Sequence, residues 1–203
     1  MKQIDRLIEN IRKEVELTGR SGGDCIFKTN VSFSIPDSVF DVPEDSDLDG
    51  AFVDFGWFLK AAENCSKEHP SPDKSFWLRQ FGKDSIPYGL SWRLPQLLDN
   101  ITSGDAWRRG VLINPFDPLK PPCVLSYQFQ CEFHGLLDMT VTMRSCDMVK
   151  VLPQDILMSW FLLKHVSEKS GYDRGSMTFN IGNAHIFYDD LELPEEFTFD
   201  DGL

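Results

Sequence analysis

The sequence predicts a single α+β domain, and three patterns lead to that class. Apolar residues recur at helical spacing near the N-terminus, they alternate with polar residues between positions 124 and 143, and a mostly apolar helical pattern follows at 155–171. A domain of 203 residues buries roughly 70% of its unfolded surface, enough to fold without a disulfide or a structural metal. We expect one domain over residues 1–203, with an acidic tail from about residue 191 onward.

The composition limits the classes of function. The formal net charge of -12 argues against a broad nucleic-acid-binding face, because such a face needs clustered Lys and Arg. The five cysteines form neither a Cys-x-x-Cys pair nor a Cys/His metal-binding spacing. They are Cys25, Cys65, Cys123, Cys131 and Cys146. An odd number fits free thiols in a reducing cytosol, so we expect no disulfide and no metal.

The N-terminus and the apolar runs predict a soluble, cytoplasmic protein. The opening "MKQIDRLIENIRKEVEL" is charged and amphipathic, without the apolar core and cleavage site of a signal peptide. The longest apolar run, Ile156–Leu163, is far shorter than the roughly 20 residues that span a bilayer. No membrane contact is expected.

The first third of the chain predicts helix, strand, loop and helix in that order. Apolar residues between Ile4 and Val15 have helical spacing, and the glycines of 18–24 end that helix. Residues 25–35 have a strand pattern, the acidic stretch 41–50 predicts a solvated loop, and 51–64 predicts the second helix.

The rest of the chain predicts a short helix and then a hairpin, a helix and a strand. Residues 65–89 look irregular because they are rich in Pro, Ser, Asp and Gly. The remaining predicted elements are a helix at 94–101, strands at 111–114, 125–133 and 137–143 with a turn at 134–135, a helix at 155–171 ended by Gly171, and a strand at 176–190 interrupted at Gly182.

Short motifs in the second half carry a resemblance to a known family. They are "PPC" at 121–123, "MRSCD" at 143–147, "LPQDI" at 152–156 and "GNAHIF" at 182–187. Upstream stand "RSGGD" from Arg20, "DFGWFL" from Asp54, "YGLSW" from Tyr88 and "WRRG" from Trp107. One motif alone is weak, but eight in order over roughly residues 1–190 resemble the thymidylate synthase family.

The resemblance implies a fold, partners and a cosubstrate. It implies one catalytic domain with a large mixed sheet packed by helices, and a homodimer that forms through the sheet. The implied substrate is a pyrimidine nucleoside monophosphate, and the implied one-carbon donor is 5,10-methylenetetrahydrofolate. No metal is implied.

Cys123 is the candidate nucleophile. Carbon 5 of a pyrimidine reacts only after a nucleophile adds at carbon 6, and a thiolate does this well. The resemblance assigns that role to Cys123, with Arg144 as the expected neighbour, since a guanidinium favours the thiolate. The alternative is a buried structural cysteine at the start of a strand, which is how we interpret Cys131 and Cys146.

The candidate phosphate ligands are arginines. A guanidinium binds phosphate oxygens in bidentate fashion, and the resemblance places Arg20, Arg144 and Ser145 around the phosphate within one subunit. It assigns Arg108 and Arg109 to the site of the partner subunit, across the dimer interface. The alternative for this adjacent pair is a solvated turn.

Asp155 stands where thymidylate synthases carry an asparagine that contacts uracil. An ionised carboxylate only accepts hydrogen bonds, and the exocyclic amine of cytosine donates one. The chain is therefore similar to the deoxycytidylate (dCMP) 5-hydroxymethylase branch, whose members serve DNA modification in phages within a bacterial cytoplasm. The alternative is a carboxylate that favours a helix N-terminus by about 0.3–1 kcal/mol.

The remaining candidate residues follow from the resemblance. Asp54 takes the place of a general-base glutamate, and its apolar neighbours favour a raised carboxyl pKa. For the base and sugar we expect Asp155, Asp147, Asn183, His185 and Tyr88, and for the folate pocket Trp77 and Asp147. Phe187 replaces a tyrosine that contacts the sugar, so the choice between ribose and deoxyribose stays open.

Two other functions remain open at this point. Hydride transfer from the folate would give a methyl product from dCMP or deoxyuridylate (dUMP), whereas addition of water gives hydroxymethyl. A homologue that binds nucleotide without catalysis is the second alternative, although Cys123 and the arginines favour an enzyme.

Overall fold

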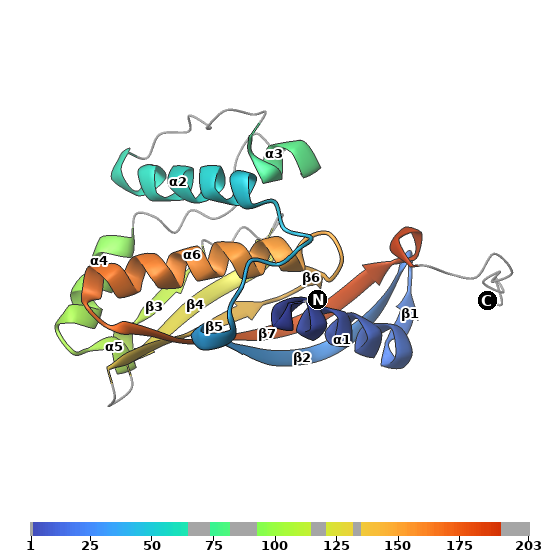
Figure 1. The fold of residues 1–203 in the computed structure, drawn as a ribbon, viewed down its shortest axis with the longest axis horizontal. Helices are drawn as coiled ribbons and strands as arrows, with labels where there is room; N and C mark the ends of the chain where they lie inside the picture. The colour runs from blue at the N-terminus through green and yellow to red at the C-terminus, as the bar shows by residue number, and fades with distance from the viewer. Residues whose placement is uncertain (1, 65–73, 82–92, 115–120, 132–134, 192–203) are drawn as a thin grey trace, which may run out of the picture.

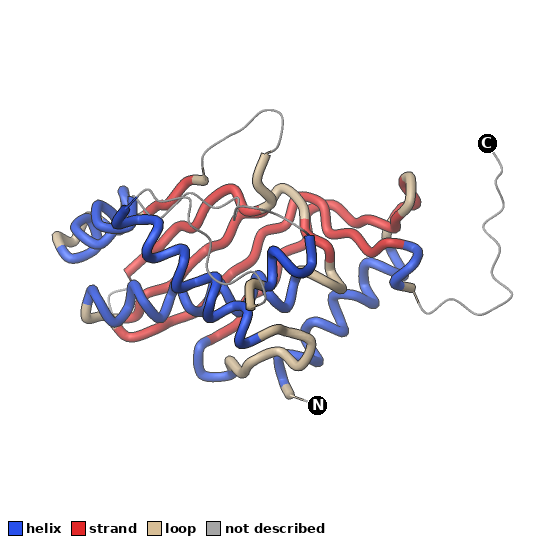
Figure 2. The backbone as a smooth tube through the Cα atoms, turned by 90° about the horizontal axis from the view of Figure 1, so that it is seen from above, coloured by secondary structure: helices blue, strands red, loops and turns tan. Residues whose placement is uncertain are grey.

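The computed structural model describes residues 2–64, 74–81, 93–114, 121–131 and 135–191. Within them, seven strands form one sheet in the order β1-β2-β7-β5-β4-β3, with β6 paired to β7. The helices gather along one side of this sheet (Figures 1 and 2). No helix of the described residues is long and apolar enough to cross a membrane.

The elements follow each other as helices and strands in groups rather than in strict alternation. The helices are α1 (Gln3–Thr18), α2 (Leu48–Asn64), α3 (Phe76–Phe81), α4 (Leu94–Thr102), α5 (Ala106–Arg109) and α6 (Leu152–Ser170). The strands are β1 (Arg20–Gly22), β2 (Cys25–Pro36), β3 (Val111–Ile113), β4 (Val124–Cys131), β5 (Leu136–Met143), β6 (Cys146–Asp147) and β7 (Asp173–Phe187). The parallel pairs are β5 with β7 and β6 with β7, and the other pairs are antiparallel. The predicted α+β class with a large mixed sheet is confirmed.

Three local predictions were wrong or incomplete. Asp49 and Gly50 were placed in a loop but lie in the first turn of α2, since that helix begins at Leu48. Residues 76–81, expected to be irregular, form α3, whose apolar residues pack on α2. Residues 20–22 form β1 against β2 instead of only ending the first helix.

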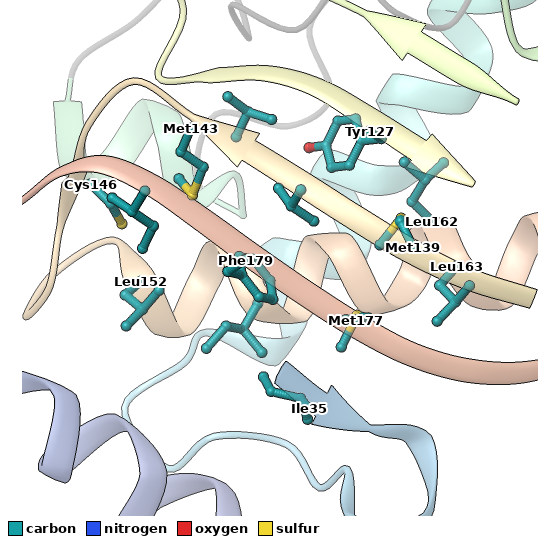
Figure 3. Packing of buried hydrophobic residues seen from close by; sticks show 14 of the residues in the cluster. Ile35, Tyr127, Met139, Met143, Cys146, Leu152, Leu162, Leu163, Met177 and Phe179 are labelled. Atoms are coloured by element: carbon teal, nitrogen blue, oxygen red, sulfur yellow. The ribbon is translucent and has the colours of Figure 1, made fainter. Parts of the chain in front are cut away.

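The core lies between the sheet and α6. Alternate residues of β5 are buried, as the sequence pattern predicted, and α6 covers them with its own apolar residues (Figure 3). Phe129 of β4 and Phe179 of β7 are fully buried, and burial of each such side chain stabilises the fold by about 1.5–3 kcal/mol. The polar residues of these strands face the side that carries no helix of the described residues, where Ser32 pairs with Asn180 and Ser34 with Thr178, both at 2.8 Å.

A kink crosses the sheet at Gly182 of β7. Buried residues of β7 are odd-numbered up to Ile181 and even-numbered from Ala184, and the facing Asn30 of β2 has a positive φ of 58°. A Cβ at Gly182 would come to 2.9 Å from the carbonyl oxygen of Arg144. The absence of a side chain therefore lets β7 approach the turn at Arg144.

The N-terminal helix fixes the loop that precedes α6. Ile4, Ile8, Ile11 and Val15 are buried against the sheet, as the helical spacing predicted. Arg12, on the same helix, donates hydrogen bonds to the carbonyl oxygens of Met148 at 2.8 Å and Val149 at 3.1 Å. These contacts hold the segment between β6 and α6, which connects the candidate residues Asp147 and Asp155.

Candidate active site

Cys123 lies directly before β4 and is half-buried. Its carbonyl oxygen accepts a hydrogen bond from the backbone N–H of Arg144 at 2.8 Å. Beyond it, the register between β4 and β5 shifts between Val124 and Ser126. The thiol thus sits at an irregular end of the sheet, where side chains that the core does not enclose can gather.

Arg144 follows β5 and binds the segment that precedes Cys123. Its Nε donates to the carbonyl oxygens of Pro121 and Pro122, both at 3.1 Å, and its Nη2 donates to that of Pro121 at 3.0 Å. Prolines have no N–H of their own, so this segment offers carbonyl acceptors without competing donors. The guanidinium is held in one orientation by these contacts.

The Cys123 sulfur lies next to the two side chains that follow β5. Arg144 Nη2 lies 3.8 Å from Cys123 Sγ, and the Ser145 hydroxyl also lies 3.8 Å from it. Arg144 Nη1 donates to Ser145 Oγ at 3.0 Å. The thiol, the guanidinium and the hydroxyl therefore form one polar group at this end of the sheet.

Asp155 lies in the first turn of α6 and is 3% exposed. The Cys146 thiol donates to its Oδ2 at an S···O distance of 3.9 Å. Burial raises the pKa of Asp155 to about 7, against the lowering by the Cys146 hydrogen bond and with a smaller rise from the charge of Asp147. Near neutral pH this carboxyl is present in both protonation states.

Cys146 is fully buried and stays a thiol. Burial, and then the charge of Asp155, raise its pKa well above the ordinary value. We interpreted Cys146 as structural only, and the structure adds a contact with Asp155 that sequence spacing did not reveal.

Asp147 and His185 are paired across β6 and β7. Asp147 Oδ1 accepts hydrogen bonds from the backbone N–H groups of Val149 at 2.9 Å and Lys150 at 3.0 Å, which fixes the carboxylate. His185 and Phe187 project from one face of β7, and their rings meet edge to face at 5.2 Å.

Lys150 and Asn183 lie at the same end of the sheet. Lys150 lies over the Phe187 ring at 5.9 Å and pairs with Asp190 at 2.7 Å. Sequence reasoning did not identify Lys150. Asn183 is half-buried and pairs with Thr29 in register.

Asp54 and Trp77 lie together away from the sheet surface. Asp54 of α2 is completely buried, and its Oδ2 accepts the backbone N–H of Trp77 at 3.4 Å. Trp77 is 4% exposed, so its ring belongs to the core between α2 and α3.

Arg20 is joined to this end of the sheet through the strand register. It pairs with Phe27, Phe27 pairs with His185, and His185 pairs with Asp147. Neighbouring strands lie about 4.8 Å apart, so Arg20 starts about three strand spacings from Asp147. Its exposed side chain is free to extend along the sheet end.

Arg108 and Arg109 lie elsewhere in the chain. They form the exposed end of α5, next to Phe129, whose N–H bonds to Gly110. Phe129 is six positions along β4 from Cys123, or roughly 20 Å at the rise of a strand. Within one subunit the structure does not bring these arginines to Cys123. Tyr88 lies outside the described residues.

No group of three or more His, Cys, Asp or Glu side chains in the described ranges is arranged to hold a metal ion. The polar side chains that do gather are a thiol, a guanidinium and a hydroxyl at Cys123, with carboxylates at Asp147 and Asp155. This set offers a thiol, a type of group that can act as a nucleophile, and a guanidinium, a type of group that binds anions.

By its structure the protein belongs to the α+β class with one mixed sheet. A thiol flanked by an arginine lies at the start of an inner strand of that sheet. The profile of the family described as thymidylate synthase matches residues 51–197, which is more than half of the chain. The chain belongs to the thymidylate synthase family.

Several curated proteins that are similar to this chain are named as thymidylate synthases. The chain is 31% identical to a thymidylate synthase of Aliivibrio fischeri over 120 residues, 52% of this chain and 42% of the relative. It is 25% identical to a putative thymidylate synthase of Methanopyrus kandleri over 123 residues, 57% of this chain and 54% of the relative. It is 23% identical to a thymidylate synthase of Buchnera aphidicola over 220 residues, 97% of this chain and 83% of the relative. The chain spans about half the length of the first two.

Proposed function

We propose that this protein transfers one carbon to C5 of a pyrimidine nucleoside monophosphate, and that its reaction is the hydroxymethylation of dCMP. In this proposal Cys123 adds to C6 of the ring, and 5,10-methylenetetrahydrofolate supplies the carbon. The observation that carries the proposal is the position of the Arg144 and Ser145 side chains, each 3.8 Å from Cys123 Sγ.

Asp155 supports cytosine as the base. In its ionised form the carboxylate accepts from the 4-amino group, and in its protonated form it also donates to the unprotonated N3 of cytosine. Uracil has a carbonyl at C4 and an N–H at N3, so a carboxylate meets its C4 oxygen unfavourably. Cytosine is therefore favoured by the ionised form of Asp155, which predominates above its pKa of about 7.

The phosphate is proposed to bind Arg20, Arg144 and Ser145, with Arg108 and Arg109 from a second subunit. The distance of α5 from Cys123 supports a contribution across an interface. The polar face of the sheet, uncovered by the described helices, offers a surface for that second subunit. His185, Asn183 and Asp147 are proposed around the sugar and base.

Asp54, Trp77 and Tyr88 complete the proposal. The buried Asp54 is proposed as the general base for proton movement around the ring. Trp77 and Asp147 are proposed for the folate side, although the Trp77 ring is buried and would have to expose one edge to the folate. Tyr88 is proposed as a further contact of the base and sugar.

Methylation is the second candidate reaction. The relatives named above are thymidylate synthases, so a methyl product from dUMP or dCMP is the alternative that similarity favours. In that reaction the folate also gives a hydride, whereas water completes the hydroxymethyl product.

Incubation with 5,10-methylenetetrahydrofolate and either dCMP or dUMP tests the proposal. Mass spectrometry of the nucleotide distinguishes a gain of CH2O from a gain of CH2. We expect a gain of CH2O on dCMP, and none with the Cys123→Ala variant. A gain of CH2 selects the second candidate, and an unchanged nucleotide with folded wild-type protein contradicts both.

A further inference from the structure

A small, partly open cavity lies beside Asp155. It has a volume of about 10 Å³, which is about the room that one water molecule needs. Its lining residues come from α2, β4 and α6: they are Phe55, Phe58, Tyr127, Asp155, Met158 and Leu162. Two of these residues, Tyr127 and Asp155, therefore place polar groups in an otherwise apolar lining.

Ser159 supplies a third polar group close to this cavity, next to its lining residues on α6. It lies one helical turn after Asp155 on α6, and residues four apart share a helix face. Its side chain is 1% exposed, and its Oγ has no hydrogen-bond partner among the described residues. A buried hydroxyl without a partner is unfavourable, and ordered water commonly satisfies such groups.

Tyr127 connects Ser159 with Asp155. Burial and then the charge of Asp155 raise the pKa of its phenol, and the Ser159 hydroxyl lowers it, so both groups lie near the phenol oxygen. Tyr127 is 6% exposed, and Figure 3 shows its ring on β4 among the apolar core residues. The Ser159 hydroxyl is near Tyr127 without forming a direct hydrogen bond of good geometry, which leaves room for a bridge.

We propose that this cavity binds one water molecule, held by Tyr127, Ser159 and Asp155, and that Tyr127 and Ser159 act through it as positioning residues for the Asp155 carboxyl. A buried water needs two to four polar partners, and the three groups provide them. The water donates to the carboxylate and accepts from the Tyr127 hydroxyl.

Among the described residues, two other elements face Asp155. From β6, Cys146 donates to Oδ2 and Asp147 contributes a negative charge. From α2, the residues that line the cavity are Phe55 and Phe58, which carry no charge. The proposed water is therefore the additional donor available to Asp155 on the cavity side.

The consequence for base choice rests on the proposed function. A hydrogen bond from the proposed water keeps the Asp155 carboxyl in one orientation toward the pyrimidine ring. Without that hydrogen bond the carboxyl can rotate. The Tyr127→Phe and Ser159→Ala variants are then expected to lose part of the preference for dCMP over dUMP, with roughly a tenfold smaller ratio of kcat/KM values.

The test measures the water and the carboxyl without any substrate. A high-resolution crystal structure of the wild-type protein is expected to show one ordered water within hydrogen-bond distance of the three oxygens. The pH dependence of unfolding is then compared among wild type, Tyr127→Phe and Ser159→Ala. Loss of a donor to the carboxylate raises the pH at which Asp155 ionises in the folded state, by about 0.5–1 pH unit in each variant.

Ser167→Ala is the matched control. Ser167 is also a buried serine of α6, but its hydroxyl donates to the Tyr172 carbonyl at 2.6 Å, away from Asp155. We expect this variant to lose stability without moving the ionisation of Asp155. A dry cavity in the crystal structure, or an unmoved ionisation in either folded variant, overturns the proposal. If the wild-type protein does not turn over dCMP but the water and both shifts are present, only the proposed function fails.

Discussion

Arg144 Nη2 lies 3.8 Å from Cys123 Sγ. The same guanidinium binds the carbonyl oxygens of Pro121 and Pro122, so its position does not depend on a ligand. The charge next to the sulfur is part of the folded chain itself. Two residues from neighbouring strand ends thereby form the centre of the candidate site.

Alkylation should distinguish Cys123 from the buried cysteine. We expect iodoacetamide to modify Cys123 much faster than Cys146, because burial raises the pKa of Cys146 and only thiolates react. Arg144→Gln should slow modification of Cys123 several-fold, as followed by peptide mass spectrometry. Arg6→Gln, on the exposed face of α1, is the control. Equal rates in Arg144→Gln and wild type would contradict the role of the guanidinium.

Asp155 should make the protein less stable as pH rises. Its pKa is raised from 3.8 to about 7, so between these values the unfolded carboxyl is ionised while the folded one keeps its proton. Folding then takes up a proton, and the free energy of unfolding falls across this window by an order-of-magnitude total of about 4 kcal/mol. Above about pH 7 the loss is complete.

Asp155→Asn tests that dependence, because asparagine does not titrate. Urea unfolding of both proteins from about pH 4 to pH 9 should show the variant gaining stability relative to wild type as pH rises. A difference that is constant over this range would show that Asp155 ionises normally in the folded state. In turnover, the same variant should lose preference for dCMP relative to dUMP.

Gly182→Ala should damage the fold near the site. The new Cβ would meet the Arg144 carbonyl oxygen at 2.9 Å, so backbone must move, at a cost of about 1–3 kcal/mol. Gly56→Ala in α2 is the matched control, since its Cβ has no atom within 4 Å, and alanine favours a helix interior by about 1 kcal/mol. Urea unfolding should show a lower free energy of unfolding for Gly182→Ala than for the wild type, and no decrease for Gly56→Ala. Equal stability of Gly182→Ala and wild type would contradict the close approach.

Mixed dimers test whether Arg109 acts across an interface. Cys123→Ala and Arg109→Ala homodimers should each be inactive, while subunits exchanged from an equal mixture should recover about a quarter of wild-type activity, because half of the dimers then hold one intact site. Activity that stays absent after confirmed subunit exchange would show that Arg109 does not complete the site of the partner subunit.

The periodicity of apolar residues accounts for most of the fold. The alternation in 137–143 and the helical spacing in 4–15 specify one buried face each, so β5 and α1 follow from local pattern. The helix α3 could not be predicted from the sequence. It is only six residues long and lies in a stretch rich in Pro and Gly, so no helical pattern stands out, although its residues pack on α2. Likewise β1 is only three residues long and exists because β2 pairs with it.

The sequence identified those candidate site residues that belong to one of the family motifs. Cys123 comes from one motif and Arg144 and Ser145 from another, yet strand pairing between β4 and β5 makes them neighbours. The contact of Cys146 with Asp155 was missed, because it depends on how α6 crosses β6 and no spacing encodes that. Ser159 and Tyr127 were missed because both fit an apolar pattern as core positions.

Release of tritium from C5 of labelled nucleotide tests the central claim most directly, because in the proposed reaction the C5 hydrogen is lost only after the Cys123 sulfur has added to C6. With 5,10-methylenetetrahydrofolate present, we predict release from [5-³H]dCMP by the wild-type protein and none by Cys123→Ala. No release from dCMP, or faster release from [5-³H]dUMP, would contradict the account of Cys123 and Asp155.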